Sequence, residues 1–167
     1  MCRAKSGIAV RVDEQTLKIY TLPGEDSHEA IREHFNLIDD GILSRYQTPV
    51  ECVPVTGIGP NVEDYDFIFD DHRPNWWTDQ MTSEAKAFLV KTFVAELQDN
   101  AYNAVNCQLD LHSLTVLPEH CTLTPGGWLD LSSLTVLPEH CTLTPGGWLD
   151  LSRSMDKNTR QRIKFML

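Results

Sequence analysis

One short stretch of the sequence gathers residue types that can move protons or hold a metal ion. Asp70, Asp71 and His72 are consecutive, and Arg73 and a tryptophan pair follow them. A carboxylate or an imidazole acts as a general acid or base when a cleft shifts its pKa, and the same groups ligate divalent cations. The stretch therefore supports a metal-dependent hydrolase centred on Asp70, Asp71 and His72. The competing and favoured interpretation is a charged loop that closes onto a tryptophan anchor.

Other enzymatic motifs do not occur in the sequence. Gly57-Ile58-Gly59-Pro60 lacks the further glycine and the following helix of a dinucleotide fingerprint. The patterns GxSxG, HExxH and GxxxxGKS/T are absent as well. We therefore expect no cofactor and no catalytic residue, and the favoured interpretation is a protein that is not an enzyme.

The strongest signal in the sequence is a tandem repeat. Residues 113–132 read SLTVLPEHCTLTPGGWLDLS, and residues 133–152 repeat these 20 residues without a difference. A partial copy precedes them, because Leu109-Asp110-Leu111 matches 129–131 and 149–151. A fixed period of this length is typical of a solenoid.

Each repeat unit contains three short runs that alternate apolar and polar residues. A period of two is what a half-buried strand requires, and the prolines and glycines between the runs favour corners. We expect one all-β coil per unit, with coils stacked about 4.8 Å apart. Equivalent residues then form columns, with Leu129 between Leu109 and Leu149, and Cys141 on Cys121.

The repeat unit also carries four segments of a known pattern: Leu137-Pro138-Glu139, Thr142-Leu143, Gly146-Gly147 and Leu149-Asp150-Leu151-Ser152. In these segments it resembles the LPxxLTxxGxLDLSxTxITx-type leucine-rich repeats of bacterial and phage proteins, tail-associated and prophage-encoded ones among them. It is more distantly similar to the 20-residue leucine-rich repeats of secreted bacterial effectors. It departs from ordinary leucine-rich repeats because it lacks the asparagine of the usual turn ladder. The resemblance implies a stacked scaffold that presents a binding surface and shares no catalysis.

The N-terminal part predicts a small α+β domain in the order ββαββα. The expected strands are 6–12, 16–22, 50–55 and 65–69. A short helix is expected with Asp26 as its N-cap and Glu29 three residues later, and a longer helix is expected to begin near Thr82 or Ser83. The segments SGIAV, TLPGEDSHEAI and FDDHRPNWW are similar to uncharacterised phage proteins that carry such repeats.

The sequence thus predicts an α+β fold in which a small N-terminal α+β domain precedes a short capped β-solenoid. Residues 1–105 form the N-terminal domain ending in the long helix, residues 106–152 the stacked repeats, and residues 153–167 a basic C-terminal cap. Two full units leave the ends of a solenoid open unless other segments cover them. Uncovered ends can pair between chains, so a homodimer through the solenoid ends is an alternative.

Charge and hydropathy limit the classes of partner. Lys+Arg 14 against Asp+Glu 24 gives a formal net charge of −10, which argues against direct nucleic-acid binding and against a polybasic membrane surface. No apolar run approaches the roughly 18–20 residues of a transmembrane helix. The first residues, MCRAKSGIAVRV, reach polar side chains too early for a secretory signal. We therefore expect a cytoplasmic protein.

The cysteines form an odd set without a CxxC pair: Cys2, Cys52, Cys107, Cys121 and Cys141. Free thiols in a reducing compartment are the expected state. His120 and His140 each precede a cysteine and offer ligands for a zinc ion shared across units. Adjacent strand residues point to opposite faces, however, so buried thiols are favoured and no metal is expected.

The outward positions of the repeat are the candidate partner-binding residues: Trp128, Trp148, Asp110, Asp130 and Asp150. Each tryptophan precedes an inward leucine, which turns the indole outward or onto the corner, and tryptophan is enriched in binding hot spots. Packing of the indoles against the Gly-Gly corner is an equal alternative. The aspartates form an outward column, which either stays solvated, as favoured, or binds a cation such as Ca²⁺ between units.

The favoured functional hypothesis is a non-enzymatic protein-interaction or structural scaffold module, phage or prophage encoded, with an unidentified protein partner. The first alternative rests on charge, because residues 109–152 hold five acidic side chains and no lysine or arginine. Such a flank can occupy the basic groove of another protein, so the alternative is an acidic nucleic-acid mimic that inhibits a host defence protein. The second alternative is the metal-dependent hydrolase.

Overall fold

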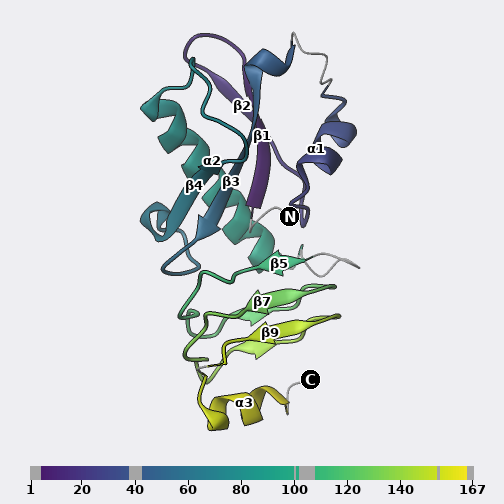
Figure 1. Ribbon diagram of the computed structural model, residues 1–167, viewed down its shortest axis with the longest axis vertical. Coiled ribbons are helices and arrows are strands. Elements are labelled where there is room, and N and C mark those ends of the chain that lie inside the picture. The colour runs from purple at the N-terminus through teal and green to yellow at the C-terminus, as the bar shows by residue number, and fades with distance from the viewer. Residues whose placement is uncertain (1–4, 38–42, 100, 102–107, 154, 165–167) are drawn as a thin grey trace.

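The computed structural model describes residues 5–37, 43–99, 101, 108–153 and 155–164. The fold is α+β, with a mixed helix-and-sheet part at one end, short stacked strands next to it and a last helix at the far end (Figure 1). We call residues 5–99 the head and residues 109–152 the repeat region. No helix among the described residues is long and apolar enough to cross a membrane.

The head contains one antiparallel sheet in the order β2-β1-β3-β4. Its strands are β1 (Lys5–Arg11), β2 (Leu17–Tyr20), β3 (Gln47–Pro54) and β4 (Tyr65–Phe69). The expected hairpin of the first two strands is confirmed, and Asp13 closes its turn by accepting hydrogen bonds from the backbone N–H groups of Gln15 and Thr16. These bonds favour the charged carboxylate and lower the pKa of Asp13.

Both helices of the head begin at other residues than expected. Helix α1 (His28–Phe35) is capped by Ser27, whose hydroxyl accepts from the N–H of Ala30, so Asp26 as N-cap is wrong by one residue. Helix α2 (Asp79–Gln98) begins well before Thr82, because Thr78 caps it. The first two residues of α2, Asp79 and Gln80, are polar and exposed, so an apolar period does not reveal the start of the helix although Met81 is already buried. Two 3₁₀ turns, η1 (Leu43–Tyr46) and η2 (Val62–Asp64), precede β3 and β4.

The two helices cover opposite faces of the sheet (Figure 1). Directly paired residues of antiparallel strands share a face, so the register assigns side chains to each layer. Gly7 and its partner Val50 face α2, since a Cβ on Gly7 would lie 3.2 Å from Leu89 of α2. The neighbouring positions therefore face α1, where Ile8 and Ile31 are fully buried. A sheet covered on both faces explains why β3 is buried along most of its length.

The strands of the repeat region are short: β5 (Leu109–Asp110), β6 (Thr122–Leu123), β7 (Leu129–Leu131), β8 (Thr142–Leu143) and β9 (Leu149–Leu151). They form a parallel sheet in the order β5-β7-β9 and a separate parallel pair, β6-β8. The pairing joins identical positions of successive units, for example Leu109 to Leu129 and Leu129 to Leu149. Each pairing therefore spans 20 residues of sequence.

The expected β-solenoid is wrong. The described strands form two small parallel sheets of two- and three-residue strands, and the Leu-Thr-Val-Leu runs contribute only an isolated bridge between Val116 and Val136. Proline has no N–H to donate to a ladder, and Pro118 and Pro125 interrupt the unit twice within eight residues. The alternation that predicted three strands per unit is thus cut before a regular coil can form.

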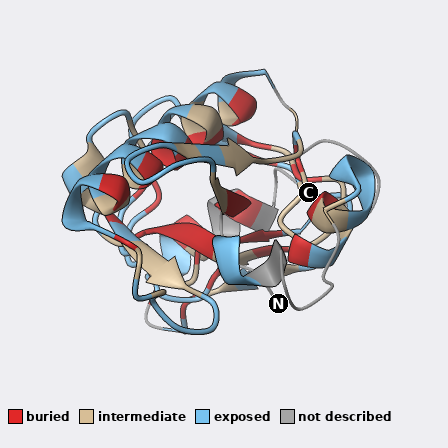
Figure 2. Cartoon of the chain, turned by 90° about the horizontal axis from the view of Figure 1, so that it is seen from above, coloured by how far each residue is buried: buried red, intermediate tan, exposed pale blue. Residues whose placement is uncertain are grey.

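The last helix, α3 (Lys157–Lys164), follows the repeat region at the far end (Figure 1). Asp156 begins it by accepting hydrogen bonds from the hydroxyl and the N–H of Thr159 and from the N–H of Asn158, which lowers its pKa. Met155 and Ile163 are buried in the same hydrophobic cluster as residues of the head and of the repeat region. Exposed stretches lie mostly on the outside when the molecule is viewed along its long axis (Figure 2). The expected domain boundary at residue 105 lies outside the described residues.

Two buried acids in the head predict a loss of stability in alkali. Tyr65 donates a hydrogen bond to the carbonyl of Gly59, and burial raises its pKa from 10.0 to about 12. Burial also raises the pKa of the Cys52 thiol from 9.0 to about 12. Both groups are neutral in the folded chain at pH values where the unfolded chain has lost the protons. Stability is therefore fully present below about pH 9 and is lost as the pH rises to 12.

Denaturant unfolding between pH 8 and pH 12 measures this loss. We expect the free energy of unfolding to fall by roughly 2 kcal/mol through Tyr65 and roughly 4 kcal/mol through Cys52 by pH 12, and the tyrosinate absorbance of Tyr65 to appear late in the titration. Tyr65→Phe removes the tyrosine contribution and flattens the decline. A free energy of unfolding that stays constant to pH 12 would contradict the prediction.

Candidate functional site

The residues of the Asp70-Asp71-His72 stretch do not converge on one site. Nδ1 of His72 lies 2.9 Å from a carboxylate oxygen of Asp71, and both side chains are exposed. Asp70 turns the other way, and its Oδ2 lies 3.3 Å from Nδ1 of His28. The three residues thus face two different parts of the molecule.

The residues after this stretch hold the loop on a buried tryptophan. Trp77 is 4% exposed, and its indole N–H donates to Oγ1 of Thr82 at 2.8 Å. Arg73 donates to the carbonyl of Trp77 and to the Asp79 carboxylate. Phe69 packs edge-on against Trp77 with ring centroids 5.0 Å apart. This is the arrangement of a charged loop closed on a tryptophan anchor.

The outward residues of the repeat region form a stripe beside β7 and β9. We call Trp128, Asp130, Trp148 and Asp150 the tryptophan–aspartate stripe. In an extended chain these residues alternate with Leu129, Leu131, Leu149 and Leu151, so they share the side that faces away from the core. Trp148 is 84% exposed, Asp150 is exposed, and Trp128 and Asp130 are half-buried.

Asp110 does not belong to this outward stripe, although the repeat predicts it there. It is 9% exposed, and its Oδ1 lies 2.6 Å from Nδ1 of His112 and accepts the N–H of the same residue. His112 replaces the serine found at the equivalent position 132. Of the three aspartates expected to form an outward column, only Asp130 and Asp150 therefore lie on the outward side.

In the repeat region His120 stacks on His140, and Cys121 lies next to Cys141. The rings of His120 and His140 are 4.8 Å apart between centroids and nearly parallel. Cys141 is buried, and burial together with the neighbouring Cys141 raises the pKa of the Cys121 thiol. Both cysteines and Cys52 are free thiols, while Cys2 and Cys107 lie outside the described residues.

A cluster that the sequence analysis missed lies in the head. His28 at the start of α1, Glu51 of β3 and Asp70 just after β4 each offer one ligand atom, and these atoms lie within 4.8 Å of one another. His28 is 7% exposed and Glu51 is 5% exposed. The three residues are about 20 positions apart in the chain, so no motif marks them. Only the sheet order and the side on which α1 lies bring them together.

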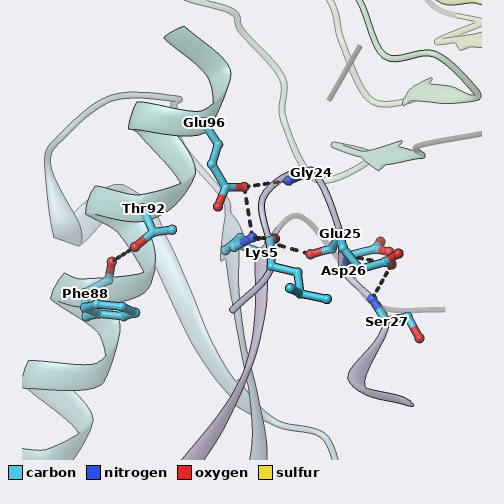
Figure 3. A network of polar contacts seen from close by, with 9 residues as sticks. Lys5, Gly24, Glu25, Asp26, Ser27, Phe88, Thr92 and Glu96 are labelled. Carbon is cyan, nitrogen blue, oxygen red and sulfur yellow. Dashed lines mark hydrogen bonds and ion pairs between the residues drawn. The ribbon is translucent and has the colours of Figure 1, made fainter. Parts of the chain in front are cut away.

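The chain leading into α1 adds carboxylates close to this cluster. Glu25 accepts hydrogen bonds from the N–H groups of Asp26 and Ser27 beside the buried Lys5 (Figure 3). Burial, and then the charges of Glu25 and Glu51, raise the pKa of Asp26 from 3.8 to about 6. The carboxylates thus give the α1 side of the sheet a strongly negative electrostatic potential.

A cavity of about 540 Å³ lies where the head meets the repeat region. Its lining includes Val94 and Leu97 of α2, Gly59 of the preceding loop, and Glu119 and His120 of the first repeat unit. The volume suits a small ligand. The charged and polar side chains of the described lining are exposed, however, so they offer no buried group that would orient such a ligand.

Comparison with known proteins does not identify the tryptophan–aspartate stripe or the cluster of His28, Glu51 and Asp70 as a functional site. Their exposure, charge and geometry are therefore the basis on which the stripe and the cluster indicate a function. No family model, no curated protein and no solved structure matches the chain.

Proposed function

We propose that the chain is a non-enzymatic protein-interaction module that binds its partner through the tryptophan–aspartate stripe. The observation that carries this proposal is the exposure of Trp148, which is 84%. Tryptophan offers one of the largest apolar surfaces of any side chain, and burying that surface against a partner stabilises the complex. Trp128, in an identical sequence context, is half-buried, so the exposure belongs to the second unit specifically.

Charge indicates what kind of protein the stripe binds. Asp150 lies two residues after Trp148 on the same side, and residues 109–152 carry five acidic side chains and no lysine or arginine. The complementary surface is an apolar socket for the indole surrounded by lysine or arginine side chains. An arginine over the indole face adds a cation–π contact. The proposed partner is therefore a basic protein.

The resemblance to bacterial and phage repeats supports a bacterial cell as the setting of this interaction. A phage- or prophage-encoded binding module in the cytoplasm is consistent with free thiols at Cys52, Cys121 and Cys141. A bacterial lysate is accordingly the first source in which to seek the partner.

Trp148→Ala is expected to abolish capture of this partner without unfolding the chain. Because the indole is 84% exposed, its loss changes the free energy of unfolding by no more than about 0.5 kcal/mol. The test is affinity capture from bacterial lysate with wild type and variant, followed by mass spectrometry and thermal unfolding of each bait. Val136→Ala, at a side chain that is 56% exposed outside the stripe, is the matched control and keeps the partner bound.

Salt separates the proposed contact from a purely electrostatic one. A hydrophobic anchor keeps a basic partner bound at high salt, whereas an acidic nucleic-acid mimic loses its target as charges are screened. A basic protein that Trp148→Ala and Asp150→Asn both release supports the proposal. A partner captured equally by wild type and Trp148→Ala contradicts it, and complete release by salt with no effect of Trp148→Ala supports mimicry instead.

A further inference from the structure

From the geometry of the head we infer that His28, Glu51 and Asp70 bind one divalent transition-metal cation such as Zn²⁺. The site lies between the start of α1 and the α1-facing side of the sheet, away from the tryptophan–aspartate stripe. One imidazole and two carboxylates form a mixed nitrogen and oxygen donor set. Such a set suits Zn²⁺ or Mn²⁺ better than Mg²⁺ or Ca²⁺, which prefer oxygen alone.

The three ligands come from three different elements that the fold brings to one face. Glu51 is paired with Ser6 of β1, at a position that faces α1 by the alternation of the strands. Asp70 follows the last residue of β4, Phe69, whose pairing with Val50 places it on the opposite face. Asp70 is therefore on the α1 side, and His28 meets it there at 3.3 Å.

A hydrogen bond orients the imidazole for metal binding. Nε2 of His28 lies 3.3 Å from the carbonyl oxygen of Val50, and a carbonyl can only accept, so Nε2 carries the proton. The other ring nitrogen, Nδ1, faces Oδ2 of Asp70 at 3.3 Å. A metal ion bound at Nδ1 takes the place of the proton that an imidazolium would donate to this carboxylate. A backbone carbonyl on the outer nitrogen is the usual support of a metal-bound histidine.

Ser6 provides a second observation at the same place. Its side-chain oxygen is buried and has no hydrogen-bond partner, and the residue is fully buried. Ser6 pairs with Glu51 and shares its face of the sheet. A buried hydroxyl without a partner is rare and calls for a bound water or ion. Water held by a cation at the three ligands supplies that partner.

The spacing of the ligand atoms requires only a small adjustment. Zinc binds nitrogen and oxygen at about 2.0–2.2 Å in tetrahedral geometry, so two ligand atoms on one ion lie roughly 3.5 Å apart. The ligand atoms here lie within 4.8 Å of one another. The side chain of Asp70 is 56% exposed, so it can move by the roughly 1 Å that remains. His28 and Glu51 are held by the packing of α1 on the sheet.

Zinc titration of the full chain by calorimetry tests this inference. We expect one ion per chain at this site, a rise in the thermal midpoint with Zn²⁺, and no response to Mg²⁺ at the same concentration. Asp70→Asn keeps the size of an exposed side chain and weakens Zn²⁺ binding at least about tenfold, the lower end of what the loss of even an outer-shell group costs. Asp71→Asn, its exposed neighbour, is the matched control and leaves the affinity unchanged.

A Co²⁺ substitution separates this site from the thiols. Cobalt bound by His28, Glu51 and Asp70 shows visible bands without thiolate-to-metal charge transfer, whereas cobalt bound by Cys121 or Cys141 shows that charge-transfer absorption. Weaker binding to Asp70→Asn, together with a spectrum free of thiolate bands, supports the inference. Equal Zn²⁺ affinity of wild type and Asp70→Asn, or no binding to the folded wild type, overturns it.

Discussion

Replacing Lys5 by methionine is expected to destabilise the chain by about 3–5 kcal/mol, because it leaves a buried carboxylate without its partner. Lys5 is fully buried, and its Nζ lies 2.9 Å from Oε2 of Glu96 on α2 (Figure 3). The same ammonium donates to the carbonyl oxygen of Leu22 at 2.5 Å, and Glu96 also accepts the N–H of Gly24 at 3.1 Å. The pair thus joins β1, α2 and the chain before α1 at one point.

A double-mutant cycle identifies the ion pair as the cause. Lys5→Met combined with Glu96→Leu removes both charges, and replacing a buried pair by apolar residues is often nearly neutral. We expect the double variant to recover most of the lost stability and to keep a deficit of about 1 kcal/mol, since the N–H of Gly24 loses its acceptor. Denaturant unfolding of wild type, both single variants and the double variant measures the coupling. A loss below 1 kcal/mol for Lys5→Met would show that the pair contributes little.

Gly146→Ala is expected to be the most damaging single-atom addition in the repeat region. A Cβ at Gly146 would lie 2.3 Å from the carbonyl oxygen of Gly126 and 3.0 Å from its carbonyl carbon. These are backbone atoms of the preceding unit, so no side chain can rotate away to make room. The N–H of Gly146 also donates to Pro125 at 2.8 Å, and this bond lengthens if the two corners separate. We expect a loss of about 3 kcal/mol or more, at the upper end of overpacking effects.

Gly59→Ala is the matched control for this variant. A Cβ at Gly59 meets nothing within 4 Å, so its stability is expected to change by less than about 1 kcal/mol. Thermal unfolding compares the two variants with wild type. An equal, small effect of both substitutions would show that the two Gly-Gly corners are not in contact.

The two identical repeat units show what local sequence does not decide. Leu129 is fully buried and Leu149 is half-buried, although both precede the same Asp-Leu-Ser segment. β7 has a neighbour on each side, whereas β9 is the last strand of its sheet. The exposure of Trp148 therefore follows from its place in the stack, and the repeated letters alone left corner packing as an equal alternative.

The sequence predicted features that depend on neighbouring residues and missed those that depend on sheet order. Alternation and turn residues located the four strands of the head, and the 20-residue period gave the pairing of Leu109, Leu129 and Leu149. The polar residues Asp79 and Gln80 hid the start of α2, and prolines ended the strands that alternation had extended into a solenoid. The cluster of His28 and Glu51 with Asp70 needed the order β1-β3-β4, which no local pattern contains.

The ion pair between Lys5 and Glu96 also has a consequence for the order of folding. Its two residues are 91 positions apart, so the head cannot be completed until the end of α2 has been synthesised. Pairing in the repeat region spans only 20 residues, and loops of that length close at a lower entropic cost. Contacts of short sequence separation form faster than distant ones. During synthesis, Lys5 therefore waits for its ion-pair partner until α2 is complete, although its strand already pairs with β2, while each new repeat unit finds its neighbour already in place.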